Sequence, residues 1–285
     1  MQLLITTSHS LLLLDLNSGV TRPLHRGAGL YYGITATPRH YLVAARRRMV
    51  SSSEPAASEQ GEILVFDRYL RHVDTWHAPF PLRDMHEIIW HRRHLWITCS
   101  FDNMLAVRKP DGSWQRWYPL GEPTAEPRDQ NHFNSLRCSG NRLWLLAHNR
   151  GASEILHFSL DTRQLLARDA LGEQAHNIWR HANQWCTCSS AEEALLGSKG
   201  FYVLTGGFPR GIARLPGGWA VGVSARAERS RRDLSDGHVL LFNRRWQERQ
   251  QLPLVGEGLV LDLLPVAAGL GGYFYRSPFY RWLCL

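Results

Sequence analysis

Lysine is almost absent from this chain of 285 residues, since Lys109 and Lys199 are the only lysines among 33 basic residues. The other 31 are arginines, whose guanidinium groups form paired hydrogen bonds with carboxylates and phosphates. A general compositional preference for arginine accounts for the same count. The arginines are also scattered, with local clusters only at 46–48 and 226–232, so the dense basic stripe of a nucleic-acid-binding protein is missing.

Cysteine is scarce as well, and its distribution argues against a disulfide framework. The five cysteines are odd in number and mostly far apart in the sequence: Cys99, Cys138, Cys186, Cys188 and Cys284. We therefore expect free thiols and a reducing, cytoplasmic location.

Targeting segments and familiar catalytic motifs are also missing. The opening stretch MQLLITTSHSLLLLDLNSG has an apolar run that ends at Asp15, with no basic segment before it and no small-residue cleavage site after it. This pattern predicts neither a secretory signal nor a membrane span. The absence of GxSxG, P-loop and HExxH motifs argues against a conventional hydrolase triad, a nucleotide cradle and a zincin helix.

A repeated pattern of paired strands runs along the chain. Each copy reads as a strand, a short turn, and a returning strand with tryptophan or tyrosine near its start; the copies begin at Tyr32, His86, His132, His176 and Arg210. Each copy is followed by a second alternating hairpin, such as EILVFDRYLRHVDTW or EILHFSLDTRQLLARDAL. Four strands per unit, with units 34 to 54 residues apart, predict the blades of a β-propeller.

The two ends of the chain are predicted to share one blade. The hairpin SLLLLDLNSGVTRPL has no complete strand pair before it, and the strand that would complete its sheet lies in GLVLDLLPV at 258–266. Counting innermost strands at the five positions above and at Leu261 gives six blades. The segment after His176 is the least regular, so a five-bladed or irregular ring is the alternative. No long linker divides the sequence, and residues 1–285 are predicted to form a single all-β domain.

On this repeat pattern and its closure by both termini, the chain resembles the six-bladed β-propeller superfamily, which includes lactonases, virginiamycin-lyase-like proteins and pure binding modules. The resemblance implies a central channel in which ligands bind where the innermost strands begin. It matches no catalytic motif of a subfamily. The calcium-binding Glu/Asn/Asp set that lactonase-like propellers imply is not visible at the strand-start positions, which hold His86, His132 and His176.

Those three histidines are predicted to occupy one repeat position on three neighbouring blades and to converge near the channel axis. Three imidazoles with an open position suit a transition metal, with iron or zinc favoured. The alternative is that they are structural histidines hydrogen-bonded around water. Glu87 is a candidate general base, although neighbouring strand residues alternate in direction and Glu87 could face away from the channel.

Amides and arginines complete the predicted site. Asn131, Asn134 and Asn177 flank the histidines in sequence and are candidate hydrogen-bonding groups. Arg210 takes the histidine position in the following blade, and the loops on the same face contain Arg46 and Arg226. These three arginines are predicted to bind an anionic substrate, although loop arginines such as Arg46 and Arg226 are often simply solvated.

Two functions remain open from the sequence. The first is a metal-dependent enzyme acting on a small anionic molecule, by hydrolysis, elimination or oxygen chemistry. The second is a metal-free binding module that presents an arginine-rich face to a protein or an acidic polymer. The enzyme requires the histidines to share a metal, and the module does not.

Overall fold

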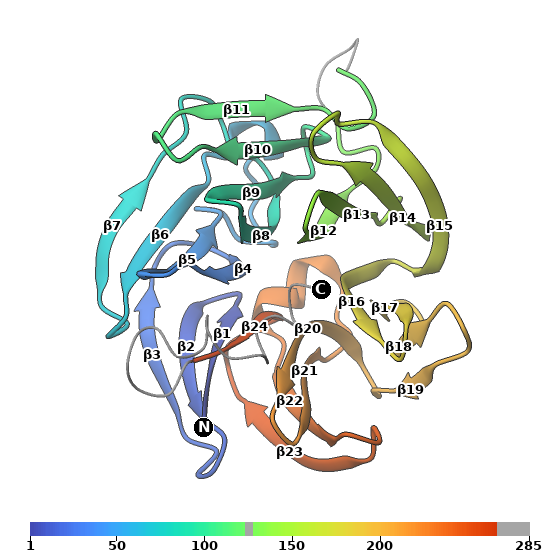
Figure 1. Cartoon of the computed structure of the whole chain (residues 1–285). Helices are drawn as coiled ribbons and strands as arrows, with labels where there is room; N and C mark the ends of the chain where they lie inside the picture. The colour runs from blue at the N-terminus through green and yellow to red at the C-terminus, as the bar shows by residue number, and fades with distance from the viewer. Residues whose placement is uncertain (123–127, 267–285) are drawn as a thin grey trace.

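The computed structural model describes residues 1–122 and 128–266, which form six four-stranded antiparallel sheets around a central channel (Figure 1). We number the sheets as blades 1 to 6 along the chain, beginning with the sheet that contains β1. Cys284 lies outside the described residues, and the four described cysteines are buried, free thiols. No helix of the described part is long and apolar enough to cross a membrane.

The first three blades are built as follows, from the innermost strand outward. Blade 1 contains β24 (Val260–Pro265), β1 (Gln2–Thr7), β2 (Ser10–Asp15) and β3 (Thr21–Arg26). Blade 2 contains β4 (Tyr31–Ala36), β5 (His40–Ala45), β6 (Glu62–Asp67) and β7 (His72–Trp76). Blade 3 contains β8 (Met85–His91), β9 (His94–Cys99), β10 (Met104–Arg108) and β11 (Trp114–Trp117).

The remaining blades repeat this order. Blade 4 contains β12 (Phe133–Ser139), β13 (Arg142–Ala147), β14 (Ala152–Ser159) and β15 (Leu165–Glu173). Blade 5 contains β16 (Ala175–His181), β17 (Gln184–Ser189), β18 (Ala194–Gly197) and β19 (Tyr202–Leu204). Blade 6 contains β20 (Phe208–Leu215), β21 (Gly218–Ser224), β22 (Gly237–Asn243) and β23 (Glu248–Leu254). Two short 3₁₀ turns, η1 (Ala56–Ser58) and η2 (Arg229–Leu234), lie in loops between second and third strands.

The predicted number of blades and the predicted closure are both confirmed. Strand β24 pairs antiparallel with β1, from Leu3 opposite Pro265 to Thr7 opposite Val260, so blade 1 combines both ends of the described chain (Figure 1). The irregular segment after His176 still forms the short hairpin β18–β19, which excludes the five-bladed alternative. Closure removes the exposed strand edges that an open ring would present.

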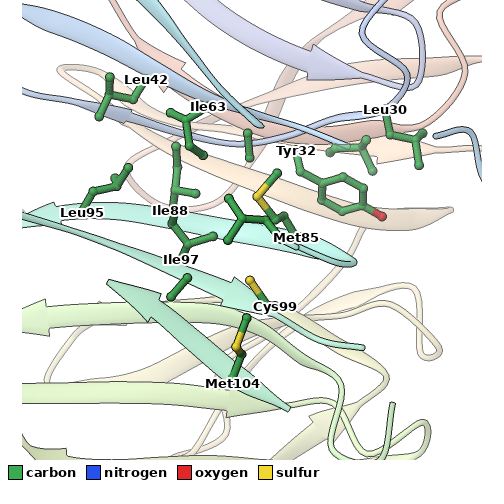
Figure 2. Packing of buried hydrophobic residues seen from close by; sticks show 14 of the residues in the cluster. Leu30, Tyr32, Leu42, Ile63, Met85, Ile88, Leu95, Ile97, Cys99 and Met104 are labelled. Atoms are coloured by element: carbon green, nitrogen blue, oxygen red, sulfur yellow. The ribbon is translucent and has the colours of Figure 1, made fainter. Parts of the chain in front are cut away.

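The hydrophobic core lies between the blades. Alternating apolar residues on each sheet face pack against the facing sheet, because a strand presents every second side chain to the same side. Figure 2 shows one such layer, in which Leu42 and Ile63 of blade 2 face Ile88 and Ile97 of blade 3. Each blade is therefore held chiefly by its two neighbours.

Every innermost strand contains a register shift near its beginning, where an extra residue is inserted. The shifts fall at Tyr31/Ile34, Met85/Ile88, Phe133/Ser135, His176/Ile178 and Pro209/Ile212, and opposite Thr6/Thr7 in blade 1. Such bulges re-aim side chains and let consecutive residues face the same side. Six of them, one per blade, form a ring around the channel.

Candidate functional site at the channel mouth

The channel mouth is the end of the ring at which the innermost strands begin. Four histidine rings follow one another around it, and neighbouring ring centroids are 4.7 Å apart from His86 to His132, 4.7 Å from His132 to His148, and 5.2 Å from His148 to His176. The sequence predicted three of these four. His148 immediately follows β13, where its ring fills the space between His132 and His176.

The predicted equivalence of the three histidines is wrong for one of them. His86 and His176 are each the second residue of an innermost strand, whereas His132 precedes its strand. Its φ angle of 49° matches the left-handed residues in the same place, Asp84 at 52° and Gln174 at 45°. The residue of blade 4 that corresponds to His86 and His176 is Asn134, because each bulge inserts a residue near the start of its strand and the repeat register is interrupted there.

Asp84 takes the place that was predicted for His176 in the metal group. Single ligand atoms of Asp84, His86 and His132 all lie within 4.8 Å of one another. The Asp84 carboxylate is 3.3 Å from His86 Nε2 and 3.8 Å from His132 Nδ1. Two metal–ligand bonds of about 2.1 Å span at most about 4.2 Å, so the group needs to contract by only about half an ångström to hold a metal. Two imidazoles and a carboxylate are a donor set that suits iron and zinc.

The protonation states also suit metal binding, which requires neutral imidazoles and an ionised carboxylate. Burial lowers the pKa of His86 to about 4, so this ring is neutral at pH 7. Burial alone would raise the pKa of Asp84, but the charges of Arg46, His86 and His132 hold it well below its usual range. His132 Nδ1 donates a hydrogen bond of 2.6 Å to Asp129 Oδ2, so His132 would ligate a metal through Nε2, which is not the nitrogen that lies 3.8 Å from Asp84.

The other two histidines are fixed as neutral rings with opposite tautomers. Ser190 Oγ donates to the Pro209 carbonyl at 2.8 Å, so it accepts from His176 Nδ1 at 2.9 Å, and the buried His176 Nε2 has no partner. The Arg150 backbone N–H donates to His148 Nδ1 at 3.0 Å, which places the His148 proton on Nε2. Burial lowers the pKa of His148 to about 2. His148 is therefore a hydrogen-bond donor and not a metal ligand.

Glu87, Asn134 and Asn177 do face the channel, but each also joins its blade to the next. Glu87 Oε2 accepts from Ser135 Oγ at 3.4 Å, Asn134 Nδ2 donates to the Ala175 carbonyl at 2.8 Å, and Asn177 Oδ1 accepts from the Gly211 N–H at 2.7 Å. Because each bulge inserts an extra residue, Glu87 lines the same small cavity as its strand neighbour His86. The concern that Glu87 and Asn177 face away was unfounded.

An acid-and-amide set is thus present in the channel, contrary to the interpretation of the sequence. Glu87, Asn134, Asn177 and Asp262 line one cavity with room for about one water molecule. Burial, followed by the charge of Asp262, raises the pKa of Glu87 well above its usual range, which favours the protonated form of this carboxyl. The role of Glu87 as a general base stays a prediction. Burial raises the pKa of Asp262 to about 7.

Two further predicted substrate contacts have other partners. Arg46 is 5% exposed and its guanidinium is saturated, with two hydrogen bonds to Glu59 of 2.9 and 2.6 Å and an ion pair of 2.5 Å with Asp84. Arg46 therefore orients the Asp84 carboxylate and is not available to a substrate. Asn131 lies in the loop before β12, where its backbone N–H donates to Asn103 and its side chain donates to Asn149.

Arg210 keeps its predicted position and its free charge. It is 7% exposed, lies over the Phe208 ring, and donates only a long hydrogen bond of 3.4 Å to Tyr32. Its Nε atom has no partner, and no carboxylate within the described residues forms an ion pair with it. A buried cation without a counter-charge is costly, so this position favours an anion.

An open pocket of about 440 Å³ adjoins Arg210 at the mouth. Arg226 and Arg232 line it together with the apolar side chains of Phe208 and Leu259. Arg226 also contacts the Ala191 carbonyl and Glu193, so it is only partly available. The pocket thus brings together Arg210, Arg232 and, in part, Arg226, and its lining also includes Glu228.

Comparisons with known proteins identify the fold and no closer relative. No family model and no curated protein matches the chain. A propeller from a nidogen/laminin complex superposes with a TM-score of 0.63 at 13% identity, over 92% of this chain and 97% of that chain. A periplasmic gluconolactonase from Pseudomonas aeruginosa gives 0.58 at 15% identity, over 94% and 99%. A streptogramin B lyase gives 0.52 at 14% identity, over 88% and 73%.

The chain is therefore a six-bladed β-propeller whose mouth combines a histidine and carboxylate cluster with an uncompensated arginine. The solved propellers that it resembles include both enzymes and a protein of a binding complex. At these identities the likeness defines the fold only, and the function has to be argued from the site.

Proposed function

We propose that this propeller is a metal-dependent enzyme that acts on a small anionic molecule at the channel mouth. Asp84, His86 and His132 would hold the metal, and Arg210 would bind the acidic group of the substrate. The observation that carries the proposal is the close approach of the Asp84, His86 and His132 ligand atoms at a mouth that also holds the buried Arg210, which forms no ion pair within the described residues.

The residues of the chain have separable roles in this proposal. When bound, the metal would supply Lewis-acid activation of water or a carbonyl, or oxygen chemistry if it is iron. Asp129 holds the proton of His132 on Nδ1, and Arg46 keeps Asp84 ionised and oriented. Arg210 fixes the anion, and the Nε2–H of His148 is a neutral donor beside both neighbouring rings.

A second cation position deserves a test because of the acid-and-amide set. Glu87 and Asp262 are two buried carboxyls on one small cavity, and Asn134 Oδ1, on the same cavity, has no partner. Oxygen donors alone suit a hard cation such as calcium, which would remove the need for protons on the two carboxyls. Under this variant of the proposal the metal lies inside the channel and the histidines face the substrate.

A binding module is the rival function, and it too has a specific observation in its favour. The mouth carries Arg226, Arg229, Arg231 and Arg232 on one loop, and the propeller with the TM-score of 0.63 comes from a protein–protein complex. Under this function the arginine-rich face would bind an acidic protein surface without any metal. Activity and metal content separate the two proposals.

The test is elemental analysis of untagged protein, covering iron, zinc, copper, manganese, calcium and magnesium as moles per chain. We expect near-stoichiometric iron or zinc that is lost in His132→Ala and His86→Ala. His77→Ala is the matched control, because its side chain is 69% exposed and remote from the mouth cluster. If the protein contains calcium that is lost in Glu87→Gln and retained in His132→Ala, the metal site lies inside the channel and not at the histidine cluster. Protein that binds no metal after reconstitution would overturn the enzyme proposal in favour of the binding module.

The proposal includes two expectations from the sequence. We infer that residues 1–285 act as one domain, which is supported by the single ring that the described residues form. We also infer a reducing cytoplasm, which is supported by four free buried thiols.

A further inference from the structure

A second pocket of about 490 Å³ lies on the face opposite the channel mouth, where the innermost strands end. It lies between blades 5 and 6 and is built from the β16–β17, β20–β21 and β22–β23 turns. We call it the turn-face pocket. Its volume is in the range of pockets that hold small molecules. The metal and substrate positions proposed above do not involve it.

The charge of this pocket has one sign. Arg180, Arg214 and Arg244 line it, one from each of three separate turns or strand ends, and no acidic residue does. None of these arginines forms an ion pair with a carboxylate of the described residues. All three arginines are exposed residues at the rim of the pocket, and a cavity lined by charge of one sign favours a ligand of the opposite sign.

The arginine side chains are partly held in place by local contacts. Arg180 donates to Asn183 Oδ1 at 2.7 Å and lies over the Trp185 ring. Arg244 donates through Nε and one terminal nitrogen to the Pro216 carbonyl, at 3.3 and 2.8 Å. These contacts use only some of the N–H groups of each guanidinium, so the others can donate to a ligand. The contacts also restrict the side-chain rotamers, which reduces the conformational entropy lost on binding.

The wall of the pocket is rigid and aromatic. Trp219 stacks on Trp246 with centroids 4.9 Å apart and an interplanar angle of 15°, and Arg214 lies over Trp219. Trp246 Nε1 donates to His181 Nε2 at 3.1 Å, which places the His181 proton on Nδ1. Burial lowers the pKa of His181, so this lining residue is a neutral donor. The polar lining is therefore rich in donors, and its walls are apolar.

We propose that the turn-face pocket binds a small phosphate monoester, with the phosphate among the three arginines and an apolar body against Trp219 and Leu215. A phosphate monoester carries close to two negative charges and three terminal oxygens, which matches three guanidinium forks approaching from different turns. A carboxylate has one charge and two oxygens, so it can satisfy fewer of them. The pocket is a site for a ligand or effector separate from the channel chemistry.

The test is calorimetric titration with phenyl phosphate, using phenol, benzoate and inorganic phosphate as comparisons. Arg210→Ala protein is titrated beside the wild type, so that binding at the channel mouth is removed. We expect one saturable site in Arg210→Ala, with affinity lowered about tenfold or more when Arg214→Ala or Arg180→Ala is added, because each removes charged hydrogen bonds. Benzoate should bind about tenfold more weakly, and phenol should show no saturable binding.

Arg142→Ala is the matched control, since Arg142 is an exposed arginine on the same face in blade 4. It should change the affinity less than twofold. Arg214→Lys keeps the charge but not the fork, and it should give an intermediate loss with an unchanged melting temperature. The proposal is overturned if phenyl phosphate does not bind, if all binding disappears in Arg210→Ala, or if Arg142→Ala weakens binding as much as Arg180→Ala and Arg214→Ala do.

Discussion

Replacing Asp262 by asparagine should remove a large part of the pH dependence of stability in the metal-free protein. Asp262 is 8% exposed and accepts backbone hydrogen bonds from Ile34 and Leu263, and burial raises its pKa from 3.8 to about 7. The folded state therefore binds this proton more tightly than the unfolded state does. Its contribution to stability is complete below pH 3.8 and is lost as the pH rises through about 7.

The expected magnitude follows from that shift. At pH 5 the folded state holds about one more proton at this position than the unfolded state, and this difference falls to about half a proton at pH 7; one proton over one pH unit is worth about 1.4 kcal/mol. We expect the wild type to lose about 2 kcal/mol of unfolding free energy from Asp262 over this range. Urea unfolding at pH 5, 6, 7 and 8 in the presence of a chelator measures it for the wild type and Asp262→Asn.

The variant also loses one backbone hydrogen bond, so the slope with pH is the informative quantity and the absolute stability is not. Asp161→Asn is the control, because the Asp161 side chain is 67% exposed. It should keep the wild-type slope. Parallel curves for the wild type and Asp262→Asn would refute the assignment of a raised pKa to this carboxyl. If calcium flattened the wild-type slope, the same carboxyl would belong to a cation site.

Three other substitutions test the packing of the ring by urea or thermal unfolding. Arg46→Ala leaves two buried carboxylates without their counter-charge and should cost about 3–5 kcal/mol; a loss below 1 kcal/mol would contradict the ion-pair geometry. Gly33→Ala would place a Cβ atom 2.5 Å from the Ile88 nitrogen of the next blade, so it should destabilise the fold by about 1–3 kcal/mol, and an unchanged melting temperature would show that the blades separate easily. Phe158→Ala, at a fully buried position, should cost about 3–5 kcal/mol, and Trp144→Ala, at a half-buried one, should cost less; the reverse order would misplace both rings.

The fold was predictable because the sequence features that define it repeat at regular intervals along the chain. Strand alternation, the tryptophan or tyrosine near the start of each second strand, and the spacing of the repeats depend on local sequence. The pairing of β24 with β1 followed from the one hairpin that lacked a complete partner pair. The third strand of the irregular fifth blade, Ala194–Gly197, shows no alternation, and its place in the sheet followed from the repeat and not from its own pattern.

The site was predictable only in part, for a physical reason that particular residues illustrate. His132 was assigned to the wrong position because the bulge in β12 interrupts the alternation at Asn134, so counting back from the apolar positions of the strand does not give the register of the residues before it. Asp84 could have been found from its place two residues before His86. The pairing of Arg46 with Glu59 depends on how the loop at 51–61 folds back, which sequence alone does not give.

The order in which the chain leaves the ribosome gives the pairing of β24 with β1 a further consequence. Strand β1 is synthesised long before its inner partner β24, which begins at Val260. Until β24 has been synthesised, the inner edge of the apolar strand β1 is unpaired, and the blade that lies between blades 2 and 6 is incomplete. The ring can therefore close only after β24 has been synthesised, and a product that stops before Val260 would retain an unpaired strand edge that other chains could pair with. Proteases and chaperones should therefore act mainly on the unpaired inner edge of β1.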